Sequence, residues 1–369
     1  MSDTQQHRPV MADVARVARV SLPTVSRVLT GVASVSPDKR DRVLAAIDEL
    51  GYRPNAAARA LVSGRRSLIA VLAGNTSLYG YARTINGIAG AARHAGYTVV
   101  IMVVESADPD VVDDAVDLVL AQPVAGVIVL EFDDVGRQVV ERLPHGIPVV
   151  SAGGQVRREG QVPSVVIDEW AGGHAVTEYL LGLGHVTVHH VAIPVLGGAP
   201  GRTEGWRDAL VEAGARVPEI LRATWEPASA YRLGLELLER PDVTAVYCGN
   251  DDLAIGVLRA FVENGVAVPQ DVSVVGFDDQ PFGEFWSPPL TTAYQDFDDL
   301  GARAFASLRR VLEPEAPVSA AAAVATPRLV VRGSAGPVGR GTAGRSTGGR
   351  GTDGRSTARP ASDGRAQQP

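Results

Sequence analysis

Residues 11–29 read MADVARVARVSLPTVSRVL, and this stretch decides how the N-terminal part of the chain folds. Apolar residues recur at helical spacing before Ser21, which is a good N-cap for a second helix from Leu22 to Leu29. Pro23 falls in the first turn of that helix, where its missing N–H costs little. Two short helices in this order predict a helix-turn-helix. Its small apolar core is expected from Ala15, Val20, Val25 and Leu29.

A third helix and a linker follow this pair. Ser36 and Pro37 predict the start of the helix, and Gly51 predicts its end. The Ala-rich segment after Asn55 spans about eight residues, which is too short for a stable helix in water. We therefore expect a helix-turn-helix domain over residues 1–51 and a hinge helix or linker over 52–66, which folds only when something supports it.

The second helix carries side chains suited to reading DNA. Hydroxyl groups and arginine can bond phosphates and base edges, and leucine can meet a thymine methyl. Those exposed on this helix are expected to be Ser21, Leu22, Thr24, Ser26 and Arg27. Pro23 offers no side-chain hydrogen bond, so readout there must be apolar or absent. Each residue alone could equally be an ordinary solvent-facing group.

From Ser67 onward the pattern of apolar residues along the chain changes. Short runs rich in valine and isoleucine, such as SLIAVLAG and DVSVVGFDD, alternate with segments of helical length. This alternation predicts a parallel sheet with helices on both faces. About eight strands over some 260 residues are too many for one small sheet, so two α/β lobes are expected within 67–332. Residues 333–369 are rich in Gly, Arg, Ser and Thr and are expected to be a disordered tail.

Charge is distributed unevenly along the chain. Residues 1–66 hold 11 Lys and Arg against 6 Asp and Glu, whereas residues 67–339 hold 18 basic and 34 acidic residues. A basic head on an acidic body suggests that the head meets a polyanion.

Composition excludes several classes of protein. No uninterrupted apolar stretch is long enough to span a membrane, and the polar N-terminus lacks a signal region. The lone Cys248 allows neither an intrachain disulfide nor a cysteine zinc cage, and His185, His189 and His190 lack a third metal ligand at plausible spacing. No nucleophile elbow or phosphate-cradling loop indicates an enzyme. We therefore expect a cytoplasmic protein that is not an enzyme and has no cofactor, metal or membrane partner.

The head resembles the lactose-repressor (LacI/GalR) family of bacterial regulators. The resemblance rests on the segments MADVARVARVS, TVSRVL and RVLAAIDELGYRPNA, and it runs through residues 11–64 without a gap. It implies that the helix from Leu22 enters the major groove, and that Leu61 enters the minor groove and kinks the duplex. The positions that match the family's DNA contacts are Ser21, Leu22, Pro23, Thr24, Ser26, Arg27, Tyr52, Asn55, Ala58 and Leu61. This chain departs from the family at Arg19, where glycine is usual.

The resemblance continues more loosely to about residue 332. It implies a two-lobed fold similar to periplasmic sugar-binding proteins, with lobe one at 67–166 and 295–325 and lobe two at 167–290. The chain would cross between the lobes at 149–167, 289–295 and 325–330. Ligands of such folds bind in the crevice at the carboxyl ends of the strands. The candidate effector-binding residues are Tyr79, Tyr81, Asp168, Arg202, Trp225, Asn250, Asp251, Asp278 and Phe297.

Several of these candidate residues also have a structural interpretation. Asp251 and Asp278 could form caps or turns, Arg202 a surface ion pair, and Trp225 part of the core, while Asp168 is equally consistent with a structural role.

Together these features predict a repressor that acts as a homodimer on a near-palindromic double-stranded operator. A sugar-like small molecule is expected to release it. A corepressor-dependent repressor or an activator of the same family remains the alternative. A binding protein without DNA function and an enzyme on an α/β scaffold are the other classes, and residues 11–64 argue against the first.

Overall fold

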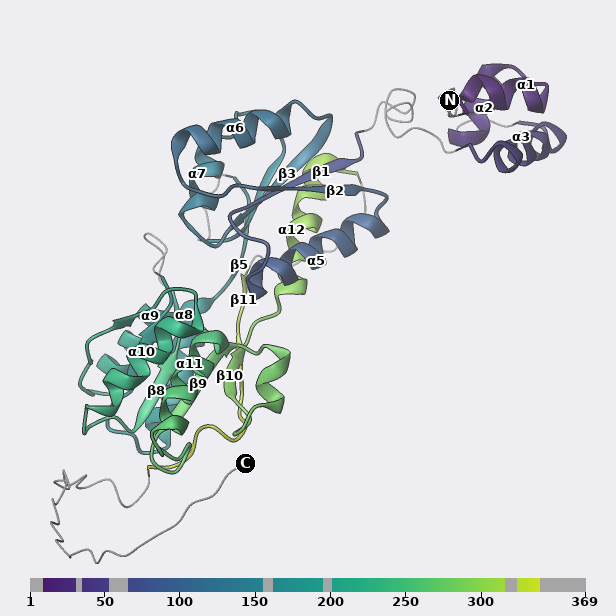
Figure 1. The fold of residues 1–369 in the computed structure, drawn as a ribbon. Coiled ribbons are helices and arrows are strands. Elements are labelled where there is room, and N and C mark those ends of the chain that lie inside the picture. The colour runs from purple at the N-terminus through teal and green to yellow at the C-terminus, as the bar shows by residue number, and fades with distance from the viewer. Residues whose placement is uncertain are drawn as a thin grey trace, which may run out of the picture.

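The structure is a computed structural model that describes residues 9–30, 35–52, 66–154, 162–194, 201–315 and 324–338. Three of the expected DNA contacts, Asn55, Ala58 and Leu61, lie outside these ranges, as does the tail from residue 339. The described chain consists of a helical head and a two-lobed α/β body (Figure 1), as predicted. No helix among the described residues is long and apolar enough to cross a membrane.

The head comprises α1 (Met11–Ala18), α2 (Leu22–Thr30) and α3 (Pro37–Leu50). One valine from each helix, Val14, Val25 and Val43, is completely buried at its centre. Apolar contacts of this kind hold short helices that would be marginal alone. α2 begins directly after Ser21, and α3 ends at Gly51, which adopts a φ of 58°. The helix-turn-helix is therefore confirmed.

The turn between α1 and α2 is built on Arg19. Its φ of 53° lies in the left-handed region, which favours glycine because a Cβ there crowds the backbone. The turn is closed by the N–H of Val20, which donates to the carbonyl of Ala15 at 3.0 Å. The family that the head resembles usually has glycine at the position of Arg19. Glycine adopts this φ without the strain that Arg19 carries.

Lobe one is a six-stranded sheet with helices on both faces. Its strands run in the order β11-β5-β4-β3-β1-β2, and every neighbouring pair is parallel. Its elements are β1 (Leu68–Ala73), α5 (Tyr79–His94), β2 (Thr98–Val103), α6 (Pro109–Leu120), β3 (Val124–Glu131), α7 (Asp134–Arg142), β4 (Val149–Gly153), β5 (Ser164–Ile167), α12 (Phe297–Leu312) and β11 (Val324–Ala325).

The alternation of side chains along β1 explains the two helical layers of lobe one. Ile69 and Val71 pack into one apolar cluster with α5 and α12, whereas Ala70 and Leu72 pack into another with α6 and α7. A strand buried on both faces reads as a continuous apolar run, which is why β1 carries no polar residue.

Lobe two repeats this architecture. Its strand order is β12-β10-β9-β8-β6-β7, parallel except that β12 runs antiparallel to β10. Its elements are α8 (Glu169–Gly182), β6 (His189–Ala192), α9 (Arg202–Glu212), β7 (Leu221–Arg222), α10 (Pro227–Leu238), β8 (Ala245–Cys248), α11 (Asp251–Glu263), β9 (Ser273–Asp278), the 3-10 helix η1 (Pro281–Phe285), β10 (Thr291–Tyr294) and β12 (Arg328–Val330).

The crossings between the lobes differ in place from those expected. β4 and β5 both belong to the sheet of lobe one, so the first crossing follows Ile167 rather than spanning 149–167. β10 pairs with β9, so lobe two continues past residue 290 to Tyr294. The third crossing falls between β11 and β12, within the expected range.

The ordered body also extends beyond residue 332, so the expected start of the tail at 333 is wrong. Ser334 is completely buried, and its hydroxyl donates to the carbonyl of Val274 at 2.6 Å. The N–H of Gly336 donates to the hydroxyl of Ser273 at 3.0 Å. The composition rich in small residues suggested disorder. In the structure, the same small residues allow this segment to pack closely against lobe two.

Glycines allow close contacts between neighbouring helices in each lobe. A Cβ on Gly173 of α8 would lie 2.1 Å from the carbonyl oxygen of Arg202, and one on Gly205 of α9 would lie 2.1 Å from that of Trp170. The same pairing joins α5 and α12, because a Cβ on Gly87 would lie 2.1 Å from the carbonyl oxygen of Asp298. The absence of side chains at these points lets the helix backbones touch.

We expect Gly173→Ala to lower the free energy of unfolding by about 1–3 kcal/mol, because the new methyl group must push α9 away. Gly182→Ala is the matched control in the same helix, since a Cβ there meets nothing within 4 Å. It is expected to leave the protein as stable or about 0.5–1 kcal/mol more stable. Urea unfolding followed by tryptophan fluorescence measures both, and equal effects of the two substitutions would contradict the close contact.

Candidate ligand cleft and nucleic-acid interface

A cleft of about 530 Å³, open to solvent, lies between the two lobes. Clefts between two domains or lobes are places where small organic ligands preferentially bind. Its lining residues are Leu78, Tyr79, Gly80, Tyr81, Phe132, Glu169, Ile193, Arg202, Trp225, Asn250, Asp252, Asp278 and Phe297. Seven of the nine residues predicted from the sequence are among them, and Asp168 and Asp251 are not.

Strand order explains why the cleft forms here. In lobe one β1 lies between β3 and β2, and in lobe two β6 lies between β8 and β7. In both sheets, therefore, successive strands are placed first on one side of the first strand and then on the other. Loops at the carboxyl ends diverge at such a point and leave a crevice. Tyr79 follows β1, Phe132 follows β3, and Asn250 follows β8, so the lining residues come from these loops.

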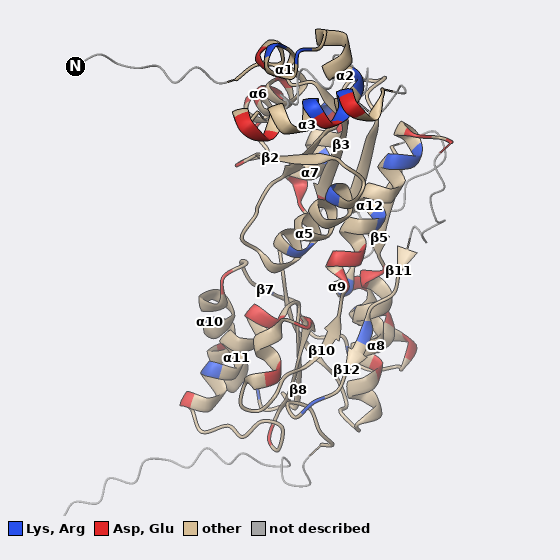
Figure 2. Ribbon diagram, turned by 90° about the vertical axis from the view of Figure 1, so that its right-hand side faces the viewer, with Lys and Arg blue, Asp and Glu red and all other residues tan. Residues whose placement is uncertain are grey.

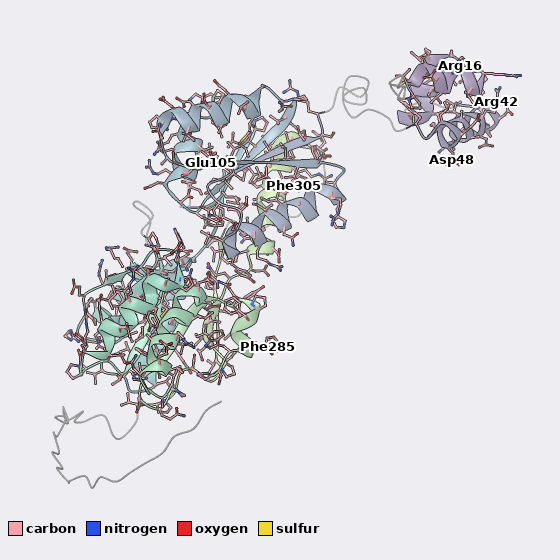
Figure 3. The ribbon with its side chains drawn as sticks, viewed as in Figure 1. Arg16, Arg42, Asp48, Glu105, Phe285 and Phe305 are labelled. Atoms are coloured by element: carbon pink, nitrogen blue, oxygen red, sulfur yellow. The ribbon has the colours of Figure 1, made fainter. Side chains whose placement is uncertain are left out.

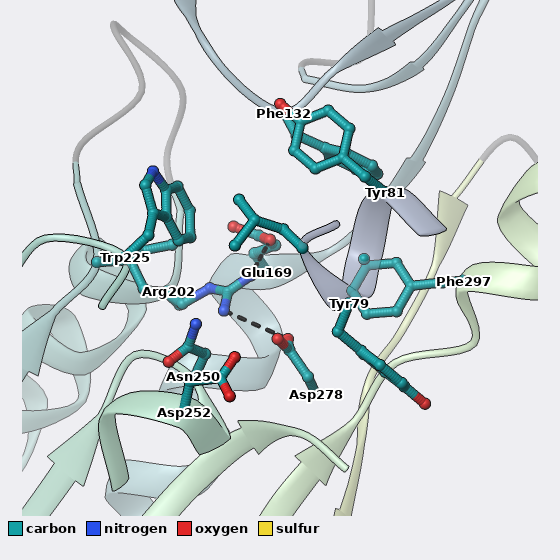
Figure 4. Close-up of a pocket in the computed structure, with 13 residues that line it drawn as sticks. Tyr79, Tyr81, Phe132, Glu169, Arg202, Trp225, Asn250, Asp252, Asp278 and Phe297 are labelled. Atoms are coloured by element: carbon teal, nitrogen blue, oxygen red, sulfur yellow. Dashed lines mark hydrogen bonds and ion pairs between the residues drawn. The ribbon is translucent and has the colours of Figure 1, made fainter. Parts of the chain in front are cut away.

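The wall contributed by lobe one is aromatic. The ring of Phe132 meets those of Tyr81 and Phe297 edge-on, with ring centroids 5.0 and 6.1 Å apart, and Tyr79 meets Phe297 in the same way at 6.0 Å. The hydroxyl of Tyr81 donates to Asp133 at 2.6 Å, and burial beside that carboxylate raises the pKa of Tyr81. This wall therefore offers ring faces and edges, with little hydrogen-bonding capacity (Figure 4).

The floor contributed by lobe two is built around Arg202, the first residue of α9. Its guanidinium donates to the carbonyl of Gly249 and to the carboxylate of Glu169, and it lies 3.5 Å from Asp278. The guanidinium also sits 4.2 Å from the ring centroid of Phe277. Burial lowers the pKa of Arg202, but Glu169 and Asp278 outweigh that effect, so the group stays charged. Arg202 is thus a buried ion-pair centre rather than a surface pair.

Asp278 ends β9 with unusual backbone and charge properties. Its φ is 102°, a region that side chains rarely adopt, and its side chain accepts a hydrogen bond of 2.8 Å from Gln295. Burial raises the pKa of Asp278 to about 7, although Arg202 and the Gln295 hydrogen bond act in the opposite direction. Strained residues of this kind are concentrated at functional sites.

Asn250 and Asp252 belong to the start of α11. The side-chain oxygen of Asn250 caps the helix by accepting from the N–H of Leu253 at 2.9 Å, which leaves its NH2 group to serve the cleft. Asp252 accepts from the side-chain amide of Gln280 at 2.9 Å. Figure 4 shows both beside the guanidinium of Arg202 and across from the rings of lobe one.

Two predicted ligand residues serve the fold instead. Asp251 is completely buried, accepting from the hydroxyl of Thr292 and from the N–H of Gln280, both at 2.6 Å. A Cβ on Gly276 would lie 2.2 Å from Asp251, so the carboxylate is enclosed on that side as well. Asp168 caps α8 through the N–H of Ala171 at 3.0 Å. Neither carboxylate lines the cleft.

Six lining residues were not predicted from the sequence: Leu78, Gly80, Phe132, Glu169, Ile193 and Asp252. Three of them carried a usable signal. Phe132 follows β3 directly, and Glu169 and Asp252 are the neighbours of the two predicted residues that do not line the cleft. Asp168 turns back to cap α8, and Asp251 is enclosed by Thr292 and Gln280, so in each pair the next residue faces the cleft.

The head presents the outer face of α2 for contact with nucleic acid. Ser21, Leu22, Pro23 and Arg27 are exposed, while Thr24 and Ser26 are half-buried. The hydroxyls of Ser21 and Thr24 lie 2.9 Å apart and hydrogen-bond to each other. Tyr52 differs from expectation, because it is only 6% exposed and packs in the apolar core of the head.

Positive charge on the described head is nearly balanced by acidic residues. Figure 2 shows Lys and Arg on α1, α2 and α3 together with Asp and Glu. Residues 53–66, by contrast, hold four Arg and no Asp or Glu. The excess that distinguishes the N-terminal part of the chain is therefore concentrated in the hinge sequence. Within the described ranges, no group of three or more His, Cys, Asp or Glu side chains is arranged to hold a metal ion.

Comparison with known proteins connects both parts of the chain to one kind of regulator. The family of bacterial regulatory proteins named lacI matches residues 10–55, and the periplasmic binding protein-like domain matches residues 177–335. The chain is 33% identical to the HTH-type transcriptional repressor PurR of Klebsiella pneumoniae (strain 342), over 79% of this chain and 87% of that protein. It is also 33% identical to the lactose operon repressor of Escherichia coli (strain K12), over 80% of this chain and 82% of that protein.

Solved structures agree with these relatives. The lac repressor dimer bound to operator and the anti-inducer ONPF matches with a TM-score of 0.80 at 30% identity, covering 89% of this chain and 99% of that one. A complex of the transcriptional regulator CelR with cellobiose matches with a TM-score of 0.62 at 30% identity, covering 89% of this chain and all of that one (100%). These relatives are transcription regulators, not enzymes.

The raised pKa of Asp278 predicts a pH dependence of stability. A carboxyl group whose pKa is higher in the folded state loses its stabilising contribution as pH rises from its unfolded value, near 4, to its folded value, about 7. We therefore expect the wild type to lose stability between pH 5 and pH 8 relative to Asp278→Asn, by on the order of 1 kcal/mol. Urea unfolding of both proteins at the two pH values measures this, and parallel profiles would contradict it.

Proposed function

The chain belongs to the lacI family of bacterial regulatory proteins, and from that premise we propose that it is a repressor released from its operator by a sugar-like molecule in the cleft. One observation carries the proposal. A single chain combines an exposed helix suited to the major groove with a cleft that pairs aromatic rings with hydrogen-bonding groups. A DNA-binding protein without an effector would need only the first, and a binding protein only the second.

We propose that α2 reads base edges and that the hinge reads the minor groove. Arg27 supplies a fork of donors for guanine or phosphate, and Leu22, 48% exposed, can meet a thymine methyl. The four Arg of residues 53–66 would neutralise phosphates beside the minor groove, into which Leu61 is proposed to wedge. Asn55 and Ala58 are proposed contacts of the same segment. Tyr52 would contact the backbone only through its hydroxyl, because its ring is enclosed.

The cleft's chemistry favours a polyol as the effector. Sugars present alternating hydroxyl groups and apolar C–H faces, which suit polar floors and aromatic walls respectively. Asn250 and Asp278 offer donors and acceptors on the floor, and Trp225 and Phe297 offer rings on opposite sides (Figure 4). The CelR relative was solved with cellobiose, which agrees with this class of ligand.

A homodimer is proposed because a near-palindromic operator needs two heads related by a two-fold axis. Two apolar surfaces in the body are available for pairing. Val100, Ile101 and Val103 are 36–44% exposed on β2, the edge strand of lobe one. In lobe two Phe285 of η1 is 84% exposed and projects into solvent (Figure 3), beside Trp286. The lac repressor dimer bound to operator, to which this chain is similar, agrees with this assembly.

Coupling between the two sites is proposed to act through the hinge. A ligand that binds both lobes shifts them relative to one another, which separates the two hinges of the dimer and unfolds residues 55–63. Because so short a helix is marginal in water, a coupling free energy of roughly 1–3 kcal/mol is enough to change operator occupancy 5–150-fold. A ligand that instead tightened operator binding would identify a corepressor-dependent regulator.

Arg27→Ala is expected to weaken specific operator binding about 5–150-fold, because a good bidentate base contact is worth about 1–3 kcal/mol. The matched control is Arg137→Ala, which removes an exposed arginine of α7 that pairs only with its own helix. Gel-shift titration with an operator selected from random-sequence duplexes measures both. Equal affinities for the two variants would rule out Arg27 as a reader.

Arg202→Lys is expected to abolish the response to the effector while leaving operator binding within about twofold. Lysine keeps the charge but loses the rigid fork that holds Gly249, Glu169 and Asp278 together. Thermal shift with mono- and disaccharides measures ligand binding, and gel shift measures DNA binding. A lysine variant that still responds to the same sugar would remove Arg202 from the site.

A further inference from the structure

The charges that line the cleft do not balance. Three carboxylates, those of Glu169, Asp252 and Asp278, face it together with one guanidinium, that of Arg202. A ligand that displaces water from these carboxylates must either be neutral or bring the opposite charge, because unpaired charge is costly once water is removed.

Arg202 is already paired with carboxylates. Its two terminal nitrogens are directed to Gly249 and Glu169, and Asp278 lies 3.5 Å away, while its Nε is buried without a hydrogen-bond partner among the described residues. The two carboxylates of this group outnumber the guanidinium, so the cluster carries a net negative charge when Asp278 is ionised. A phosphorylated sugar would therefore meet like charge rather than a free cation.

Asp252 adds a further negative charge that nothing in the cleft offsets. Among the described residues it takes part in no ion pair within 4 Å, and it accepts a hydrogen bond of 2.9 Å from the neutral side-chain amide of Gln280. It is close enough to Asp278 to raise the pKa of that carboxyl. Two carboxylates from different elements, α11 and β9, are thus directed toward the same space (Figure 4).

Aromatic rings surround that space on both sides. Trp225 lies on the side of lobe two, and Phe132, Tyr79 and Phe297 lie on the side of lobe one. The hydroxyl of Tyr79 points away from Arg202, so its ring rather than its oxygen is presented to the cleft. Ring faces attract cations through their quadrupoles, and tryptophan does so most strongly. Carboxylates and ring faces together form an environment that suits an ammonium group.

We propose that the effector is a sugar-sized polyol carrying a protonated amine, such as an amino sugar, and that Asp252 is the residue that selects its charge. The inference rests on the proposed function, because it names the ligand class of the same cleft. Asp278 and Asn250 bond hydroxyl groups of the ring, while the ammonium donates to Asp252 and lies against Trp225. The guanidinium of Arg202 holds the floor in shape.

Isothermal titration calorimetry on the full chain at neutral pH tests this. The probes are glucosamine, galactosamine and mannosamine, each compared with its N-acetyl derivative, with the parent hexose and with glucose 6-phosphate. N-acetylation removes the charge and keeps the ring. At least one amine is expected to bind tenfold or more tightly than its N-acetyl derivative and its parent hexose, and glucose 6-phosphate is expected not to bind.

Asp252→Asn provides the residue-level test. It is expected to weaken binding of that amine at least tenfold and to change binding of the parent hexose less than threefold. Asp114→Asn, at an exposed position of α6, is the control and should change neither. The proposal is overturned if no amine binds, if a neutral hexose or glucose 6-phosphate binds as tightly as the best amine, or if Asp252→Asn keeps the preference for the amine.

Operator gel shifts separate this inference from the proposed function. Release of the operator by a neutral sugar and not by any amine would leave the sugar-responsive repressor standing and refute the charged effector. Absence of specific DNA binding under all conditions would refute the repressor, whereas preferential binding of an amine in calorimetry would still support the charge selection by Asp252.

Discussion

A guanidinium buried at the start of α9 organises the floor of the cleft. A charge removed from water must be paired and fully hydrogen-bonded, or the fold loses several kcal/mol. The terminal nitrogens of Arg202 are paired with groups from three different elements, Glu169 at the start of α8, Gly249 after β8 and Asp278 at the end of β9, while its Nε has no hydrogen-bond partner among the described residues. Because every partner lies at the carboxyl edge of the sheet or at the helix start that follows a crossing, satisfying one charge fixes the surface on which a ligand would rest.

The same group connects the floor to the chain segments between the lobes. Asp278 accepts from the side chain of Gln295, which lies at the second crossing, directly before α12 of lobe one. The first and third crossings are tied to each other, since the N–H of Asp168 donates to the carbonyl of Ala325 at 2.7 Å. We propose that a ligand which changes the bonding of Asp278 acts on Gln295 and thereby on the angle between the lobes. Burial of Gln295, 3% exposed, means that such a change cannot be absorbed by solvent.

Local sequence signals were sufficient to predict the helices of the head and the α/β fold class of the body. Pro23 and Gly51 mark helix ends through backbone conformations that act within a few residues, so their roles are readable without tertiary structure. Ser21 and Ser36 also precede helix starts, although Ser36 makes no side-chain capping hydrogen bond. The alternation of β-branched runs and helical segments likewise identified parallel sheets. Boundaries of the lobes were less accurate, because β10 and the segment around Ser334 join lobe two through pairing partners far away in the sequence.

Prediction of the cleft failed where two acidic residues stand side by side. Asp168 precedes Glu169, and Asp251 precedes Asp252; in each pair the second residue lines the cleft. The first caps a helix or is enclosed by the fold, which depends on where the backbone N–H groups point rather than on residue type. Tyr52 shows the same limit, since packing against the head core decides which part of the side chain remains outside.

The central claim is that one ligand in the cleft and one operator on the head affect each other through the fold. The most direct test measures the affinity of the full chain for its operator with and without a saturating cleft ligand, and the affinity for that ligand with and without operator. Linkage requires both affinities to change by the same factor. We predict an equal decrease of 5–150-fold in both, for a coupling of roughly 1–3 kcal/mol. Two affinities that do not depend on the other partner would contradict the account.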